Sequence, residues 1–180
     1  MTEYRRRNTL RHVGYDYTNA GAYFVTLRAH RGLRVFGEVV NGVMVLNPLG
    51  RIADQCWTEF AERHTDAQVD VHVIMPNHAH VLLWIMDTGS AEPGAVSKTR
   101  KFGDAIAGSL SSLVGAYKSA VTQQAAHRGL IPAPPLWQRN FHDHIVRGEQ
   151  ELERIREYIR QNPARWKYGH EVGPEEPYER

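Results

Sequence analysis

Residues 69–86 read VDVHVIMPNHAHVLLWIM and decide the fold. Valines alternate with polar residues from position 69 to position 73, which predicts a half-buried strand, because successive side chains of a strand point to opposite faces. Pro76 and Asn77 then turn the chain. The apolar run that follows, residues 78–86, predicts a second strand paired with the first.

The segments on the N-terminal side of this strand pair predict a strand, a tight hairpin and a helix. Residues 22–30 (AYFVTLRAH) alternate aromatic and β-branched residues and predict a strand. Two short apolar runs flank Asn41-Gly42, a dipeptide that favours a type I′ hairpin turn because both positions need a positive φ. Asn47 and Pro48 are typical of a helix N-cap and the first helical position. The apolar stripe of the helix that follows comprises Leu49, Ile52, Cys56, Trp57 and Phe60.

The C-terminal side predicts two helices and one more strand. Residues 105–127 place apolar residues three or four positions apart and predict a long helix, which Gly129 and the prolines after it end. Residues 136–147 predict a strand, and residues 149–162 predict a last helix that Pro163 ends. The order strand, helix, strand pair, helix, strand, helix is the ferredoxin-like split βαβ pattern with extra pieces. We therefore expect an α+β fold, with an antiparallel sheet and the helices packed on one of its faces.

Length and composition indicate one globular domain over residues 1–180. The chain is 42% hydrophobic and 23% charged, which is richer in apolar residues than disordered chains are. A domain of this size buries roughly 70% of the surface that its unfolded chain exposes, enough for a core. Residues 87–103 are small, polar and basic without periodicity, and we expect a mobile internal loop there. Residues 168–180 are rich in acids, and we expect a loose tail.

Cys56 is the single cysteine, which excludes an internal disulfide or a multi-cysteine metal cluster and fits a reducing compartment. Because it lies on an apolar helical stripe, we expect it to serve packing. The longest unbroken apolar run, residues 81–86, is far shorter than the ~20 residues of a membrane span. The first twenty residues contain arginines but no apolar stretch. We therefore expect no signal peptide, no membrane partner and a cytoplasmic location.

The net charge is only +2, yet the cations gather in three places. Residues 1–34 hold seven arginines against two acids, KTRK occupies residues 98–101, and residues 154–167 contribute five more cations. Such clusters can form a basic stripe that contacts phosphates. They can equally be solvated faces and a basic terminus, and composition leaves both interpretations open.

His78 and His80 form the first candidate site. Side chains two apart on a strand project from the same face, so both imidazoles point the same way and can form a bidentate site for a divalent metal. The structural alternative is a strand end that carries two exposed or hydrogen-bonded histidines. The histidine-triad nucleotide hydrolases need a third histidine where Leu82 stands, which disfavours that family.

Tyr158 and Asn162 form the second candidate site. Residues i and i+4 of a helix lie on one face, so the phenol and the amide can serve one site at the rim of the surface on which the last helix packs. A tyrosine there is by default a residue of the core edge. As a nucleophile, a phenol with an ordinary pKa of about 10 needs a metal or a base.

Residues 137–147 form the third candidate site, with arginines among aromatic and histidine side chains. Strand alternation places Arg139, Phe141, Asp143 and Ile145 on one face and Asn140, His142 and His144 on the other. Arginine beside aromatic rings suits a nucleotide strand, because the charge meets phosphates and the flat rings meet bases. Core aromatics with a solvated arginine rim give the same pattern, so this segment alone is ambiguous.

Three blocks of the sequence carry a family resemblance when they are taken together and in order. They are MPNHAHVLLW at residues 75–84, WQRNFHDHIVR at residues 137–147 and EYIRQNPARW at residues 157–166. They resemble the single-tyrosine HUH transposases, above all the REP-associated tyrosine transposases. Residues 22–30 and GAYK at residues 115–118 also resemble family segments, so the likeness covers roughly residues 14–167.

The resemblance implies a ferredoxin-like enzyme that cleaves and rejoins single-stranded DNA, with Mg²⁺ or Mn²⁺ held by the histidine pair. Carried over by position, His78 and His80 are metal ligands, and Tyr158 is the nucleophile that forms a covalent 5′-phosphotyrosine. Asn162 falls where the family places a third, polar ligand, and many relatives have the longer Gln there. The implied partner is single-stranded or hairpin DNA. One tyrosine suffices if the cuts follow one another or occur in two protomers of a homodimer.

Several cations are candidate phosphate contacts on this DNA. They are Arg139, Arg147, Lys118 on the long helix, Arg154 one turn before Tyr158, and Arg5, Arg6 and Arg7. Two alternatives stay open. A domesticated protein could recognise repeat hairpins without cutting them. A small-molecule or RNA phosphohydrolase could use the same histidine pair with an activated water and no tyrosine.

Overall fold

The structure, a computed structural model, describes residues 19–87, 108–131 and 135–166. Arg5, Arg6 and Arg7, the predicted loop beyond Asp87 and the predicted tail at residues 168–180 lie outside these ranges. The strands are β1 (Gly21–Arg28), β2 (Gly37–Val40), β3 (Val43–Leu46), β4 (Ala67–Met75), β5 (His78–Ile85) and β6 (His142–Ile145). The helices are α1 (Pro48–Thr58), α2 (Phe60–Arg63), α3 (Leu110–His127) and α4 (Glu149–Arg165), with a 3-10 turn, η1 (His30–Gly32).

Four strands form the main antiparallel sheet, in the order β4-β5-β1-β6. The hairpin predicted over residues 69–86 is its β4–β5 pair. The chain passes from β1 to β4 through α1 and α2, and from β5 to β6 through α3. The two strands that each connection joins are separated by one other strand. β5 lies between β1 and β4, and β1 lies between β5 and β6. This is the split βαβ arrangement, so the predicted ferredoxin-like α+β fold is confirmed.

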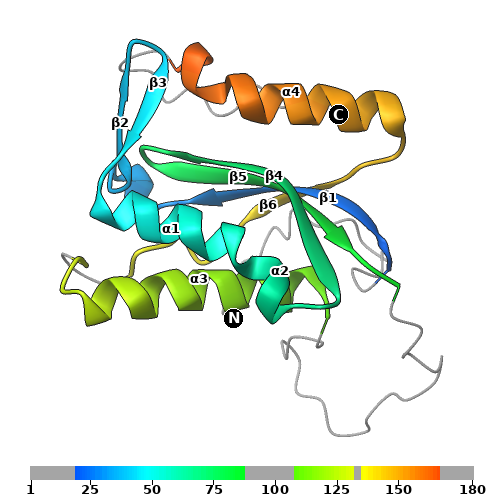
Figure 1. The fold of residues 1–180 in the computed structure, drawn as a ribbon, viewed down its shortest axis with the longest axis horizontal. Coiled ribbons are helices and arrows are strands. Elements are labelled where there is room, and N and C mark those ends of the chain that lie inside the picture. The colour runs from blue at the N-terminus through cyan, green and yellow to red at the C-terminus, as the bar shows by residue number, and fades with distance from the viewer. Residues whose placement is uncertain (1–18, 88–107, 132–134, 167–180) are drawn as a thin grey trace, which may run out of the picture.

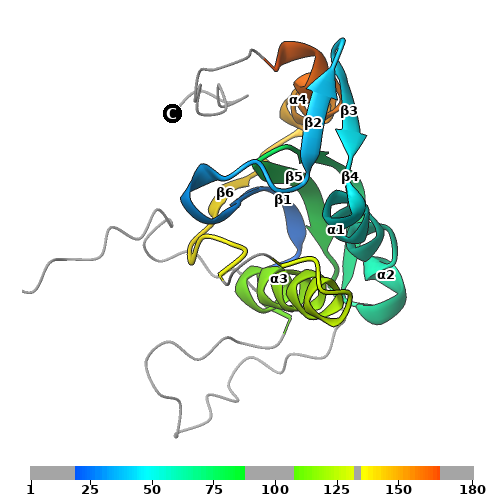
Figure 2. The same ribbon diagram turned by 90° about the vertical axis from the view of Figure 1, so that its left-hand side faces the viewer.

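Helices cover both faces of the sheet (Figures 1 and 2). α1, α2 and α3 lie on one face, and α4 lies on the other, so the expectation that all helices share one face is wrong for the last helix. β1 supplies the reason. Its Tyr23 and Val25 belong to the core under the first three helices, whereas its Ala22 and Phe24 pack beneath α4. A strand that is apolar on both faces needs a covering layer on each.

The larger core lies between the sheet and the first three helices. There the Trp57 and Tyr117 rings stack with centroids 3.8 Å apart, and the Tyr117 hydroxyl donates to the carbonyl of Ala53 at 3.1 Å. Cys56 is buried in this core, as expected for a packing residue, and burial raises the pKa of its thiol. The smaller core, beneath α4, contains Ala22, Phe24, Leu82, Leu152, Ile155, Tyr158 and Ile159.

The predicted hairpin turn at Asn41-Gly42 and the predicted helix cap at Asn47 are both present. Asn41 and Gly42 have φ angles of 51° and 77°, the left-handed pair of a type I′ turn, and they join β2 to β3. The side chain of Asn47 caps α1 and accepts a hydrogen bond from the amide of Gly50 at 2.8 Å. The tip of the β2–β3 hairpin stands beside the C-terminal end of α4, where a Cβ on Gly42 would lie 3.5 Å from the Cα of Ala164 (Figure 1).

The ends of the long helices differ from the prediction. α4 continues past Pro163 to Arg165, and the turn after the proline is closed by the amide of Trp166, which donates to the Pro163 carbonyl at 3.2 Å. α3 begins at Leu110 with Ser109 as its N-cap, later than the predicted start at residue 105, which lies outside the described ranges. Among the described helices, none has the length and apolarity needed to cross a bilayer.

The strand predicted over residues 136–147 is shorter in the structure. β6 occupies its last part, and Trp137 adds one isolated bridge to the residue after β1. Between these two places, the ammonium of Lys118 on α3 donates hydrogen bonds to the backbone carbonyls of Gln138 at 2.9 Å and Asn140 at 3.3 Å. These carbonyls bond to α3 rather than to a neighbouring strand, so the ladder does not continue.

Candidate functional site

His78 and His80 lie at the start of β5, on the sheet face that α4 covers. Their ring centroids are 4.6 Å apart. Leu82, the next residue on this face, packs in the core beneath α4. The predicted common face of the two imidazoles is therefore confirmed.

In each imidazole, Nδ1 has a polar partner within the fold and Nε2 has none among the described residues. Nδ1 of His78 lies 2.7 Å from Oδ1 of Asn77, and Nδ1 of His80 lies 2.9 Å from Oγ1 of Thr26. Both Nε2 atoms are buried and have no hydrogen-bond partner among the described residues. Buried polar atoms are nearly always paired, so two neighbouring exceptions indicate a place for a ligand.

Burial lowers the pKa of both histidines. The pKa of His78 falls to about 4 because burial and the positive charge of Arg28 disfavour its protonated form, while the side chain of Asn162 acts in the opposite direction. The pKa of His80 falls well below its ordinary value through burial first, and then through His78 and Arg28. Both imidazoles are therefore neutral at neutral pH, which is the form that binds metals.

α4 brings the second candidate pair to the same place. The ring of Tyr158 lies edge-on to that of His80, with centroids 5.3 Å apart, and 5.9 Å from that of Phe24. Asn162 lies one turn further on, where its side chain acts on the pKa of His78. Tyr158 and Asn162 are 6% and 9% exposed, so they face inward rather than lie at a solvated rim. The fold thus joins residues about eighty positions apart in the sequence into one site.

The donor set at this site is two imidazoles and one amide. In the part of the chain that the structure describes, no group of three or more His, Cys, Asp or Glu side chains could hold a metal ion. Two neutral imidazoles with unused Nε2 atoms fit a divalent metal whose other positions are filled by oxygen ligands. The arrangement fits the ligands implied by the family resemblance, and their role as ligands stays a prediction.

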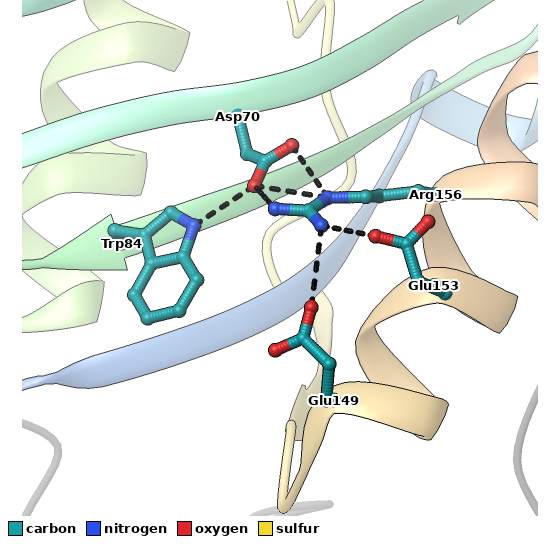
Figure 3. A network of polar contacts seen from close by, with 5 residues as sticks. All are labelled: Asp70, Trp84, Glu149, Glu153 and Arg156. Atoms are coloured by element: carbon teal, nitrogen blue, oxygen red, sulfur yellow. Dashed lines mark hydrogen bonds and ion pairs between the residues drawn. The ribbon is translucent and has the colours of Figure 1, made fainter.

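An ion pair fixes α4 to the edge strand β4 (Figure 3). Arg156 donates from Nε to Oδ1 of Asp70 at 3.0 Å and from Nη2 to Oδ2 at 2.6 Å. Oδ2 of Asp70 also accepts the indole N–H of Trp84 at 3.0 Å, and Arg156 further contacts Glu149 and Glu153. The hydrogen bonds from Arg156 are the main reason that the pKa of Asp70 is lowered. Because Arg156 is two residues before Tyr158, this pair helps to fix the position of the tyrosine.

A β-bulge turns Asp70 toward α4. Strict alternation would place Asp70 on the same face as His72, whose Nε2 lies 2.9 Å from Asp54 of α1. The register of β4 against β5 shifts between Val69 and Val71. As a result Val69 packs on the α1 side, whereas Val71 packs beneath α4. The predicted regular alternation over residues 69–73 is therefore wrong at this point, and nothing in the local sequence marks the bulge.

A second contact fixes the start of α4 to the other edge strand, β6. Glu151 binds Nε2 of His144 through Oε1 at 2.9 Å and accepts the backbone amide of Arg147 through Oε2 at 2.7 Å. α4 is thus held from both edges of the sheet. These anchors were not identified from the sequence, because an acid in the first turn of a helix is ordinarily explained by the helix dipole.

The predicted phosphate contacts within the described residues come from different elements of the fold. Arg139, Arg147 and Arg154 are exposed. Lys118 instead supports the segment before β6, as described above, lies 5.7 Å from the Phe141 ring centroid and has its pKa lowered to about 8 by burial. It belongs to α3, on the sheet face opposite α4, and its role as a phosphate contact stays a prediction.

Five residues near the site were missed by the sequence reasoning. Thr26 and Asn77 bind the histidines, and the charge of Arg28 lowers the pKa of both. The ring centroids of Trp166 and His78 are 5.9 Å apart. The guanidinium carbon of Arg34, in the segment between η1 and β2, lies 5.8 Å from the Trp166 ring centroid. A usable signal existed for Thr26, since it is a hydroxyl within the apolar strand AYFVTLRAH.

Comparison with known proteins identifies a relative and a shared fold, and no family model matches the chain. A protein of Haemophilus influenzae, described as uncharacterized, is 32% identical over 166 residues, which cover 91% of this chain and 90% of the relative. A solved structure of a REP-associated tyrosine transposase bound to a REP hairpin has a TM-score of 0.53 and 18% identity. That match covers 91% of this chain and 73% of the other. The chain therefore belongs to the family of the Haemophilus protein and has the fold of a REP-associated tyrosine transposase, as its three sequence blocks predicted.

Proposed function

We propose that this protein is a DNA strand transferase that nicks and rejoins single-stranded or hairpin DNA through Tyr158. The observation that carries the proposal is the meeting of two partnerless histidine nitrogens with a tyrosine from a different element. Histidine ligands and a tyrosine nucleophile are what the sequence blocks imply for these positions. The shared fold with a transposase supports the same conclusion.

His78, His80 and Asn162 would hold the divalent metal, Mg²⁺ or Mn²⁺. When bound, the ion supplies Lewis-acid polarisation of the scissile phosphate and neutralises charge that develops on its oxygens. The fold supplies the rest of this site. Burial keeps both imidazoles neutral and keeps competing protons off the ligand nitrogens.

Tyr158 would act as the nucleophile. Its phenol loses a proton to solvent, its oxygen forms a bond to phosphorus, the bond from phosphorus to the 3′-oxygen breaks, and the 3′-oxygen takes up a proton from solvent. The products are a 5′-phosphotyrosine and a free 3′-OH, and the reverse reaction rejoins a strand without ATP because the phosphodiester energy is retained. The two anchors of α4, Asp70–Arg156 and Glu151–His144, hold the phenol in one position, which lowers the entropic cost of attack.

Single-stranded or hairpin DNA is the proposed partner. The transposase with the shared fold was solved bound to a REP hairpin. Arg139, Arg147 and Arg154 are exposed and supply positive charge that suits phosphates. A phosphohydrolase needs an activated water but no tyrosine, so the inward-facing Tyr158 beside His80 favours strand transfer over that alternative.

Trapping of a covalent protein–DNA adduct tests the proposal. An oligonucleotide that carries a hairpin with a single-stranded flank is labelled at its 3′ end in one sample and at its 5′ end in another, and each is incubated with protein and Mn²⁺. We expect the 3′-labelled fragment to stay with the protein on a denaturing gel, because the 5′-phosphate is the end that becomes attached. The 5′ label should be released as a fragment with a free 3′-OH, and EDTA should prevent both results. A protein that binds the hairpin but never forms an adduct would be the domesticated binding protein instead.

A further inference from the structure

β1 and the β4–β5 turn hold both histidines by their Nδ1 nitrogens. Asn77 contacts Nδ1 of His78, and Thr26 contacts Nδ1 of His80. Thr26 is directly opposite His80 in the β1–β5 register and is 3% exposed. The carbonyl of Asn77 accepts the amide of Ala29 at 2.8 Å, so the residue after β1 fixes the turn. One strand thus constrains both imidazoles.

These contacts determine which nitrogen carries the proton. A neutral imidazole has one N–H and one lone pair, and the partner of one nitrogen decides the tautomer. The Oδ1 of Asn77 can only accept, so Nδ1 of His78 must donate to it, and the lone pair is then on Nε2. The hydroxyl of Thr26 can accept in the same way, and when it does, His80 has the same tautomer. Phe24 stacks on the His80 ring with centroids 5.2 Å apart and fixes the plane of that ring.

We propose that Asn77 and Thr26 are positioning residues that hold His78 and His80 in the Nδ1–H tautomer, so that both Nε2 lone pairs point into one site. The proposal rests on the metal-binding part of the proposed function. It explains why both Nε2 atoms are buried without a partner while both Nδ1 atoms are bonded. Removal of such outer partners typically costs 10–100-fold in metal affinity.

Paired variants separate the hydroxyl and amide contacts from packing. Thr26→Val keeps the shape of the side chain and removes the hydroxyl, whereas Thr26→Ser keeps the hydroxyl. Asn77→Ala removes the acceptor, whereas Asn77→Asp keeps an acceptor. Thr58→Val is the matched control, because Thr58 is an exposed residue of α1 whose hydroxyl donates to the Asp54 carbonyl, away from the site. Thermal melts identify any variant that does not fold.

Metal affinity is measured first, on the full chain without DNA, by titration with Mn²⁺ followed through the EPR signal of the free ion. We expect Thr26→Val and Asn77→Ala to lose about 10–100-fold in affinity. Thr26→Ser, Asn77→Asp and Thr58→Val should stay within about threefold of the wild type. Equal affinity of Thr26→Val and the wild type would overturn the proposal for Thr26, and equal affinity of Asn77→Ala would overturn it for Asn77. If Thr26→Val does not fold, the ¹⁵N signals of His80 in the wild type decide for Thr26, and the Asn77 variants decide for Asn77.

The tautomer is measured second, by ¹⁵N NMR of the imidazole nitrogens in the metal-free protein. We expect both histidines to show a protonated Nδ1 and an unprotonated Nε2. Protonated Nε2 atoms in the wild type would contradict the proposal. This readout needs neither metal nor DNA, so it distinguishes a failure here from a failure of the proposed function, which would show instead as a wild-type protein that binds no Mn²⁺.

Discussion

His78 and His80 each use Nδ1 within the fold and leave Nε2 without a partner. A buried polar atom left unpaired costs about 1–3 kcal/mol. A fold that keeps two such atoms side by side therefore loses stability that a leucine pair would not lose. A ligand bound between the two Nε2 atoms would recover this loss. The candidate site is therefore defined by these two nitrogens.

Replacement of either histidine by alanine tests the site at this scale. His78→Ala or His80→Ala removes one ligand nitrogen, so we expect adduct formation to fall below detection while the affinity for hairpin DNA stays within about threefold. His127→Ala, at the exposed end of α3, is the control and should behave as the wild type. Adduct yield on a denaturing gel and binding by fluorescence anisotropy are the measurements. If His78→Ala forms adduct at the wild-type rate, the histidines are hydrogen-bonded strand residues without a role in cleavage.

At the scale of elements, α4 decides whether the site exists. Its apolar stripe places it on the sheet, but the stripe alone does not fix how far the helix slides along its axis. The Asp70–Arg156 and Glu151–His144 contacts fix this position, from the two edge strands. Tyr158 lies between these two anchors and the hairpin tip at Gly42.

Asp70→Asn tests the first anchor through stability. A hydrogen bond between charged groups contributes about 1.5–3 kcal/mol, so we expect the free energy of unfolding to fall by roughly that amount. Glu153→Gln is the matched control, because Glu153 also contacts Arg156 but is 56% exposed and does not join the helix to the sheet. Its effect should stay within about 0.5 kcal/mol. Urea denaturation measures both, and equal effects of the two variants would show that the ion pair does not anchor α4.

The same carboxylate predicts a pH dependence. The pKa of Asp70 is lowered in the folded protein, chiefly by its hydrogen bonds from Arg156, so the folded state holds fewer protons there than the unfolded chain. Its stabilisation is complete above the unfolded pKa, about 4, and is lost as the pH falls through the lower folded value. We expect Asp70→Asn to lose less stability than the wild type between about pH 5 and pH 2. Parallel curves for the two proteins would contradict this assignment.

The elements themselves were largely predictable, and the anchors were not. Asn41-Gly42 and Asn47-Pro48 act through their own backbone angles and side-chain caps, so a short window of sequence contains their cause. Asp70 reaches Arg156 only because of a bulge, which depends on how β4 pairs with β5. Such a shift is a property of two strands together, and a single strand's alternation carries no sign of it.

At the scale of the whole molecule, the sheet separates two surfaces with different chemistry. The histidines, Tyr158 and Asn162 lie on the α4 side, while Lys118 belongs to the α3 side and bonds to backbone carbonyls. Sequence alone did not show which face of the sheet α3 covers, so the backbone contacts of Lys118 could not be predicted. His78, His80 and Tyr158 could be singled out from the sequence because the histidine pair lies on one strand and the tyrosine on one helix.

DNA binding tests the predicted arginine contacts. Single-stranded DNA releases counterions with a log–log salt slope of roughly −0.7 for each neutralised phosphate, so three to five contacts predict a slope of about −2 to −3.5. Arg139→Ala should weaken binding to a hairpin with a single-stranded flank and reduce the slope by about 0.7. Arg63→Ala, on α2 and paired with Glu59, is the control that should change neither. A flat slope, or equal affinity for a blunt duplex, would exclude a single-strand binding surface.

Mapping of the covalent adduct tests the central claim most directly. Tyr158→Phe removes one hydroxyl from a buried ring, so we expect a folded protein that binds hairpin DNA and forms no adduct at all. Tyr168→Phe, the nearest tyrosine in the sequence, is the matched control and should form adduct as the wild type does. Digestion of the wild-type adduct and mass spectrometry of the nucleotide-linked peptide should place the phosphodiester on Tyr158. Adduct that persists in Tyr158→Phe, or a linked peptide that contains another residue, would contradict the account.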